Sequence, residues 1–216
     1  MAIISDKFVF LHIPKTGGVW ATHAMRQVVP IEMLGDQHNH FPSLLVNSTL
    51  TEEWFREKFI FTMVRHPISW YQSRWAFRVK HGWRMEHPLD YHCASNDFHQ
   101  FVENALEFKP DGWVSWLYNT FIESVPGGID YVCKLESGVD DLHTALLRSG
   151  VQHEKSTLSN LKRVNDSDMG GFPSKYWAKY TQELYDRVID VESHCINRYY
   201  SDYKLNACDY VGERPW

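Results

Sequence analysis

The sequence predicts a single-domain α/β fold, in which helices flank a small parallel sheet. Three short runs of apolar and β-branched residues are typical of buried strands, at 7–13, 59–64 and 129–134. Segments with helical spacing and turn signals separate these runs, and strands that alternate with helices pair in parallel through crossover connections. The 216 residues match the usual size of one domain, so we assign the range 1–216 to a single domain.

Capping residues mark where the predicted helices begin. Thr49 and Glu52 have the spacing of a capping box, and Pro67 suits the first turn of the helix after the second strand. Asn96 or Asp97 can cap a further helix. We therefore predict helices over 18–28, 49–58, 67–80, 96–106, 112–124 and 137–150, and loops or irregular chain over 30–48, 81–95 and 151–173.

The C-terminal segment is predicted to be helical because its apolar residues recur at spacings of three or four. They are Leu184, Val188, Val191, Cys195 and Tyr199. This spacing places them in one stripe on a helix surface, where they can pack against the rest of the domain.

The composition limits the kinds of partner that we expect. The formal net charge is −5, which argues against a broad grip on nucleic acid or on acidic membranes, so any phosphate site must be a local positive pocket. We find no signal peptide and no apolar run near the roughly 20 residues that span a bilayer, which predicts a cytoplasmic protein without a membrane contact. The four cysteines have no CxxC spacing, so no zinc site is predicted.

The first strand runs into the sequence IPKTGG, which has the character of an anion-binding turn. Gly17 and Gly18 let backbone N–H groups approach an anion closely, and the helix that follows points its positive end at the same place. Lys15 and the Thr16 hydroxyl can both reach such an anion. The alternative is an ordinary strand–turn–helix connection with a surface lysine. Because GxxxxGK[ST] is absent, the turn is not a Walker A loop.

The second strand ends in VRHPISWYQS and predicts a second anion-binding element. Arg65 stands at the strand end, and Ser73 lies about two helical turns beyond Pro67. An arginine fork and a helical hydroxyl can clamp one phosphate, although an arginine at a strand end is often only part of a salt bridge. The carboxyl ends of parallel strands share one edge of the sheet, so we expect IPKTGG, VRHP and KLE to lie near one another.

These motifs resemble those of sulfotransferases that use 3′-phosphoadenosine 5′-phosphosulfate, especially the carbohydrate enzymes of the heparan 2-O type and their short bacterial relatives. IPKTGG is similar to the 5′-phosphosulfate loop, and Arg65 and Ser73 match the 3′-phosphate element. YVCKLES, RVNDS and DYKLNACDY resemble later motifs, so that motif order covers nearly the whole chain. Trp70 stands where carbohydrate-type enzymes often have a second arginine.

The resemblance implies a P-loop-NTPase-like sulfotransferase fold and a set of site residues. The donor would bind at Lys15, Thr16, Gly17, Gly18, Val19, Trp20, Arg65 and Ser73, with Trp20 stacked on adenine. The expected donor is 3′-phosphoadenosine 5′-phosphosulfate, and the expected product is adenosine 3′,5′-bisphosphate.

Sulfuryl transfer needs a cation at the leaving group and a base for the acceptor. Lys15 supplies the cation, and a histidine is the simplest base near neutral pH. His38 and His40 resemble the His-x-His of 2-O-sulfotransferases, and we expect His40 to be the base with His38 as helper or substitute. The alternative is two exposed loop histidines. The reaction requires no metal, and neither this pair nor the group around His87 has the spacing of a metal site.

The acceptor is expected to carry a hydroxyl, on a glycan or on a small alcohol or phenol. Residues 75–125 are predicted to form an acceptor-side insertion whose aromatic residues line the acceptor or pack in the core: Trp75, Phe77, Trp83, Tyr91, Trp113, Trp116 and Tyr118. Two other functions stay open at this point. One is a nucleotide-dependent, kinase-like phosphotransferase, and the other is a non-catalytic relative that only binds a nucleotide.

Overall fold

The computed structural model describes residues 2–35, 40–46, 48–161 and 178–212. The chain divides into two units, one built from Met1–Arg65 and Leu117–Asn165 and the other from His66–Trp116 and Asp166–Trp216. The first unit contains the sheet, whereas the second is mainly helical. The assignment of 1–216 to one domain stays a prediction.

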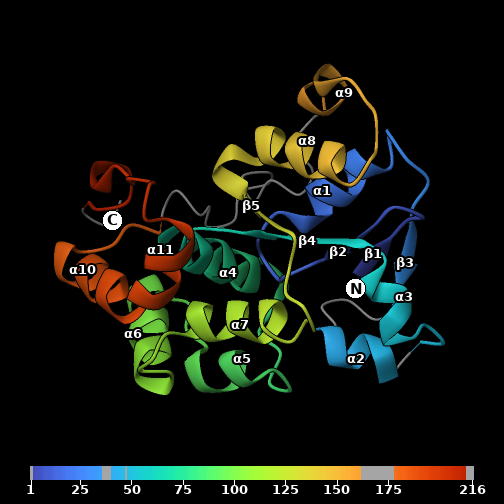
Figure 1. Ribbon diagram of the computed structural model, residues 1–216. Coiled ribbons are helices and arrows are strands. Elements are labelled where there is room, and N and C mark those ends of the chain that lie inside the picture. The colour runs from blue at the N-terminus through green and yellow to red at the C-terminus, as the bar shows by residue number, and fades with distance from the viewer. Residues whose placement is uncertain (1, 36–39, 47, 162–177, 213–216) are drawn as a thin grey trace. The chain divides into compact units, whose positions relative to one another are not determined.

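The first unit is built on a five-stranded sheet with the strand order β3-β1-β2-β4-β5 (Figure 1). The strands are β1 (Ala2–Ile4), β2 (Phe8–Leu11), β3 (Glu32–Leu34), β4 (Phe59–Val64) and β5 (Tyr131–Lys134). β2, β4 and β5 are parallel, with Phe8 opposite Phe59 and Phe61 opposite Tyr131. The three strands predicted from the sequence are therefore confirmed, as is their parallel pairing.

The sheet is mixed rather than purely parallel, which corrects the sequence prediction. β1 and β3 are antiparallel additions, and each has only three residues. Strands so short show no readable period. The hairpin between β1 and β2 depends on Ser5, whose Oγ accepts hydrogen bonds from the N–H groups of Lys7 (3.1 Å) and Phe8 (3.0 Å) and so reverses the chain.

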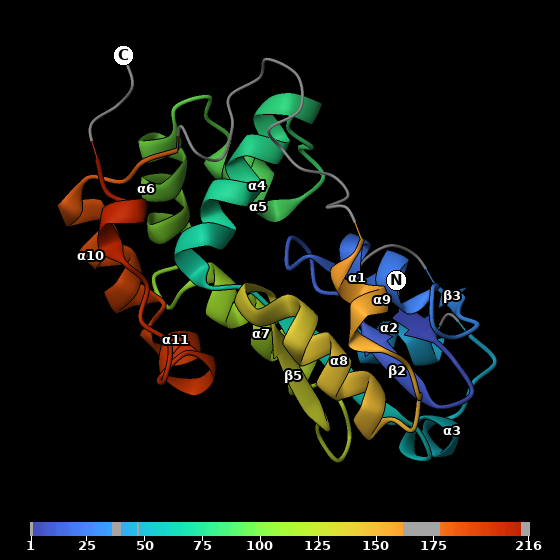
Figure 2. The ribbon, with the colours of Figure 1, turned by 90° about the horizontal axis from the view of Figure 1, so that it is seen from above.

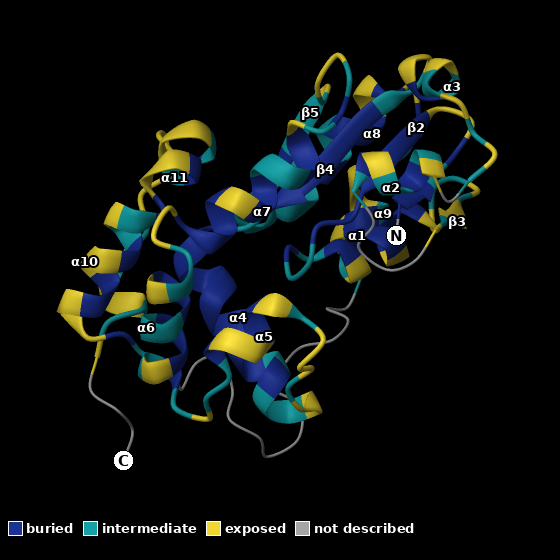
Figure 3. Ribbon diagram, turned by 90° about the horizontal axis from the view of Figure 1, so that it is seen from below, coloured by how far each residue is buried: buried dark blue, intermediate teal, exposed yellow. Residues whose placement is uncertain are grey.

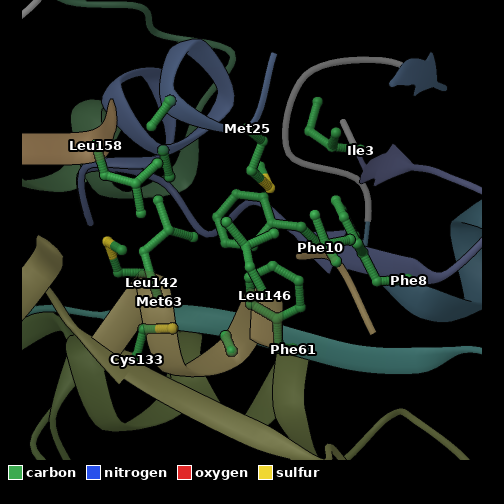
Figure 4. Close-up of a cluster of buried hydrophobic side chains, with 14 residues drawn as sticks. Ile3, Phe8, Phe10, Met25, Phe61, Met63, Cys133, Leu142, Leu146 and Leu158 are labelled. Carbon is green, nitrogen blue, oxygen red and sulfur yellow. The ribbon is translucent and has the colours of Figure 1, made fainter. Parts of the chain in front are cut away.

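Helices cover both faces of the sheet within the first unit (Figures 1 and 2). On one face lie α1 (Gly18–Met25), α8 (Gly138–Arg148) and α9 (Lys155–Ser159), whose apolar side chains join the cluster drawn in Figure 4. On the other face lie α2 (Phe41–Val46) and α3 (Glu52–Arg56), which contribute Phe41, Leu44 and Phe55 to a second cluster.

Alternating residues of the central strands contribute their side chains to the two hydrophobic clusters. Phe8 and Phe10 of β2 face the first cluster, whereas Val9 and Leu11 face the second. All four are buried, because a parallel strand between two helical layers is covered on both sides. Figure 3 shows the same for β4, which is buried along most of its length. This is why the predicted strands appear in the sequence as continuous apolar runs.

The second unit consists of helices and a short tail. Its elements are α4 (Pro67–His81), α5 (Pro88–Cys93), α6 (Phe98–Phe108), the start of α7 (Trp113–Ile122), α10 (Gln182–Val191), α11 (Ser193–Tyr199) and the 3₁₀ helix η3 (Ala207–Asp209). An isolated bridge between Tyr180 and Val211 ties the tail back to the segment before α10. The carboxylate of Glu192, between α10 and α11, accepts hydrogen bonds from the N-terminus of α7.

Helix starts agree with the sequence prediction in most places. α4 begins at Pro67 as expected, and Asp97 caps α6 by accepting a hydrogen bond from the Gln100 N–H. The cap of α3 is Thr51 rather than Thr49, since the Thr51 side chain accepts from the Trp54 N–H. Three short helices, α2, α5 and α9, lie where loop or irregular chain was expected, and the C-terminal helix is divided at Glu192.

Candidate functional site

Three loops that follow β2, β4 and β5 meet at one edge of the sheet in the first unit. The Arg65 guanidinium, just after β4, donates from Nη1 to the Lys15 carbonyl oxygen at 3.4 Å. After β5, the 3₁₀ helix η1 (Leu135–Ser137) places the Leu135 side chain against Gly17, where a Cβ would lie 2.4 Å from Leu135 Cδ1. The predicted meeting of IPKTGG with the segments after the other two strands is confirmed for these residues.

The backbone of the IPKTGG loop is unusual at two positions. Gly17 has φ 90°, which glycine adopts readily, and it caps α1. Lys15 has φ 66°, and it is the only non-glycine residue with positive φ in the part of the chain that the structure describes. A lysine in the left-handed region costs about 1–3 kcal/mol, and such strain is typically found at ligand-binding and active sites.

Thr16 stabilises the IPKTGG turn through a hydrogen bond within the loop. It is fully buried, and its Oγ1 donates a hydrogen bond to the Ile13 carbonyl oxygen at 2.9 Å. The hydroxyl proton is therefore used within the loop, which holds the segment before the glycines in one conformation. A direct contact of Thr16 with a ligand stays a prediction.

Gly18 is required where the loop enters α1. A Cβ at this position would lie 1.9 Å from Cδ2 of His12, a buried residue directly after β2. Only glycine lets the His12 ring pack this close to the start of the helix. His12 also stacks on Phe10, with ring centroids 6.3 Å apart.

Val19 and Trp20 follow in the first turn of α1. Val19 is exposed, whereas the half-buried Trp20 indole lies against Gly138 at the start of α8, where a Cβ would be 3.3 Å from Trp20 Cζ3. Trp20 also packs against the first hydrophobic cluster. Its stacking on an adenine ring stays a prediction.

The sequence places Tyr118 among the acceptor-side aromatic residues and does not connect it with Arg65. This tyrosine lies in α7 and is fully buried. Its hydroxyl accepts a hydrogen bond from the Arg65 N–H at 2.8 Å and donates one to the Arg65 carbonyl oxygen at 2.5 Å. One side chain thus holds both polar backbone groups of Arg65. Only the tertiary structure brings these residues together, since 53 positions separate them.

Of the two candidate bases, His40 is described and His38 lies outside the described residues. His40 is half-buried and directly precedes α2. Its ring lies 3.3 Å from Ser43 Oγ, measured from Nδ1, and meets Phe121 edge-on with centroids 6.3 Å apart. The neighbouring hydroxyl can orient the imidazole. The role of base stays a prediction for both histidines.

Ser73 and Trp70 lie in α4, within the second unit. Ser73 is buried, so its hydroxyl belongs to a packed surface of the helix. Trp70 is 1% exposed and packs edge-on against Tyr71, with ring centroids 5.4 Å apart. Trp70 is therefore an aromatic residue of the packed core of this unit.

The aromatic residues of 75–125 have different environments. Trp75, Trp113 and Tyr118 are buried, whereas Tyr91 and Trp116 are exposed. Phe77 and Trp83 are half-buried. Some aromatic residues of the predicted acceptor-side insertion therefore lie in the core. The motif RVNDS lies outside the described residues, and Lys134 of YVCKLES donates its N–H to Asp141 Oδ2 at 2.6 Å.

A buried ionic cluster lies in the second unit. Asp90 Oδ1 is 2.5 Å from Arg74 Nη2, and Asp90 Oδ2 is 2.6 Å from Arg78 Nε. His87 Nδ1 lies 3.2 Å from the same Arg74 nitrogen, and burial together with the charge of Arg74 lowers the pKa of His87 to about 4. Within the described residues, no group of three or more His, Cys, Asp or Glu side chains is placed to hold a metal ion.

Two further findings concern membrane-spanning helices and similarity to known proteins. Among the described helices, none combines the length and the hydropathy that crossing a membrane requires. No family model, no curated protein and no solved structure matches this chain significantly.

Proposed function

We propose that the protein is a sulfotransferase that moves a sulfuryl group from 3′-phosphoadenosine 5′-phosphosulfate to an acceptor hydroxyl. The observation that carries this proposal is the junction of Lys15 and Arg65. A lysine in a strained turn and an arginine from the adjacent strand end are joined by a hydrogen bond from Arg65 Nη1 to the Lys15 carbonyl oxygen. Two cations on two loops suit a ligand with two separate anionic groups.

Each part of the site has a role in the proposed reaction. The N–H groups at Gly17 and Gly18 would bind the 5′-phosphate, and the Lys15 ammonium would stabilise the charge that develops on the bridging oxygen. Arg65 would bind the 3′-phosphate, which ATP does not carry. His40 would take the proton of the acceptor hydroxyl, with Ser43 as the neighbour that orients its ring. Ser73 stays a sequence-based candidate for the 3′-phosphate.

A comparison of two nucleotides tests the donor site. Adenosine 3′,5′-bisphosphate should bind more tightly than 5′-AMP by calorimetry, by about tenfold to a hundredfold, because a hydrogen-bonded charge contributes about 1.5–3 kcal/mol. Arg65→Ala should remove most of this difference. The matched control is Arg56→Ala, since Arg56 is an exposed arginine of the same unit that pairs with Glu52. Equal affinities of wild type for the two nucleotides would refute the proposal.

A transfer assay tests the chemistry. Wild-type protein, a labelled sulfate donor and a panel of glycans, alcohols and phenols should yield a sulfated product that mass spectrometry identifies. Lys15→Ala and His40→Ala should fold normally and lose at least about a hundredfold in transfer rate. Lys7→Ala and His23→Ala replace exposed residues of the same unit and should keep the wild-type transfer rate.

The outcomes of that assay separate the candidate functions. Magnesium-dependent turnover of ATP, without sulfate transfer, would indicate the kinase-like phosphotransferase instead. Nucleotide binding without transfer to any acceptor in the panel would favour the non-catalytic relative. A His40→Ala variant that transfers at the wild-type rate would remove His40 from the role of base.

A further inference from the structure

The backbone of Arg65 is held by a single side chain from another part of the chain. Arg65 is the first residue beyond β4, so it lies outside the ladder that pairs β4 with β2 and β5. The Tyr118 hydroxyl bonds to both its N–H, at 2.8 Å, and its carbonyl oxygen, at 2.5 Å. These two bonds hold the backbone of Arg65 directly beyond the end of β4, where pairing with the neighbouring strands has ended.

Tyr118 is itself a rigid anchor. Its side chain is fully buried within α7, and a tyrosine ring has only two side-chain torsions to fix. The hydroxyl accepts a hydrogen bond from Arg65 and donates one to the same residue. Movement of Arg65 therefore requires either the loss of two partly buried hydrogen bonds or the displacement of a core side chain.

The far end of Arg65 is placed at the same time. Its Nη1 bonds to the carbonyl oxygen of Lys15, whose backbone has the strained φ of 66°. A bidentate contact with a phosphate depends on the direction of the planar guanidinium as much as on its charge. Two hydrogen bonds to the backbone of Arg65 and one contact at its tip restrict these directions before the ligand arrives.

We propose that Tyr118 is a positioning residue that presets Arg65 for the 3′-phosphate of the nucleotide. This inference rests on the proposed function, because it deepens the account of the same site. Tyr118 touches no reacting atom in this scheme. Its effect is confined to ligands that carry the 3′-phosphate.

Tyr118→Phe tests the inference, since it removes the hydroxyl and keeps the ring. The Kd of adenosine 3′,5′-bisphosphate should rise about tenfold, whereas the Kd of 5′-AMP should stay within about twofold of wild type. In the transfer assay, KM for the donor should rise with little change in kcat. In an Arg65→Ala background, Tyr118→Phe should have no further effect on the affinity for the bisphosphate.

Tyr71→Phe is the matched control. It removes an equally buried hydroxyl, which donates to Glu192 Oε1 at 2.7 Å in the second unit, and it should leave the ratio of the two Kd values unchanged. A Tyr118→Phe variant that keeps the wild-type ratio overturns the inference and leaves the proposed function intact. A wild-type protein that binds both nucleotides equally overturns the proposed function itself.

Hydrogen exchange of the wild-type protein provides a second test that needs no variant. The Arg65 amide should be protected already in the free protein and gain little on binding the bisphosphate, because its hydrogen bond to Tyr118 exists beforehand. An Arg65 amide that exchanges without protection in the free protein and becomes protected only with nucleotide overturns the inference.

Discussion

Replacing Glu192 by alanine should strongly destabilise the second unit. The Glu192 carboxylate is fully buried and accepts four hydrogen bonds from O–H and N–H donors, and the Cys195 thiol lies 3.9 Å from Oε2. Oε1 accepts from the Tyr71 hydroxyl (2.7 Å) and the Val114 N–H (2.9 Å), and Oε2 accepts from the N–H and the hydroxyl of Ser115 (both 2.8 Å). Two of these donors are N–H groups in the first turn of α7, which have no partner within the helix.

The magnitude follows from the donors that lose their acceptor. The hydroxyls of Tyr71 and Ser115 can rotate, but the N–H groups of Val114 and Ser115 cannot. A buried donor without a partner costs about 1–3 kcal/mol, so the two N–H groups together cost about 2–6 kcal/mol. Part of this cost is offset, because an ionised carboxylate is itself costly to bury. The pKa of Glu192 is raised by burial for the same reason. We expect Glu192→Ala to lower the free energy of unfolding by about 3–4 kcal/mol.

Glu192→Gln sharpens the test because it keeps the shape of the side chain. An amide has one oxygen, so at least one of the two N–H groups of Val114 and Ser115 faces an NH₂ group. The expected loss is about 1–3 kcal/mol, the cost of one unsatisfied donor. This variant also remains informative where alanine abolishes folding.

Urea denaturation, followed by far-ultraviolet circular dichroism and tryptophan fluorescence, measures these losses. Glu107→Ala, on an exposed position of α6, is the control and should change the free energy of unfolding by less than about 0.5 kcal/mol. The reasoning is refuted if Glu192→Ala costs no more than this control, or if glutamine costs more than alanine.

Three further predictions concern titration, packing and thiol reactivity. Burial lowers the pKa of His66 from 6.5 to about 4, so unfolding takes up a proton and stability should fall by up to about 3 kcal/mol as the pH drops from about 6.5 to about 4. His66→Asn keeps an acceptor for the Ile68 N–H and should flatten that part of a stability–pH profile. Gly18→Ala should cost about 1–3 kcal/mol in urea denaturation, because its Cβ meets the His12 ring; a variant as stable as wild type would contradict this packing. In the native protein, a thiol reagent should modify the exposed Cys208 rapidly, as peptide mapping can show, whereas the three buried cysteines should react only on unfolding.

Local signals in the sequence were sufficient to predict the central framework. Strands β2, β4 and β5 were predictable because they are covered on both faces, which leaves continuous apolar runs. The start of α4 was predictable from Pro67, since proline is favoured in the first turn of a helix. Short elements were not predictable: three-residue strands such as β1 carry too few side chains to show a period.

The candidate site divides in the same way. The sequence by itself was enough to place the IPKTGG turn, Lys15 and Arg65 at strand ends. Glycine, proline and the end of an apolar run are local features that can be read from a few neighbouring residues. Only the tertiary structure decided that Tyr118 holds Arg65, that Trp70 is core, and that Glu192 caps α7. These contacts join residues more than 50 positions apart or depend on which side of a helix is buried. Hydrogen bonds of that kind are selected by packing, which leaves no periodic signal in the sequence.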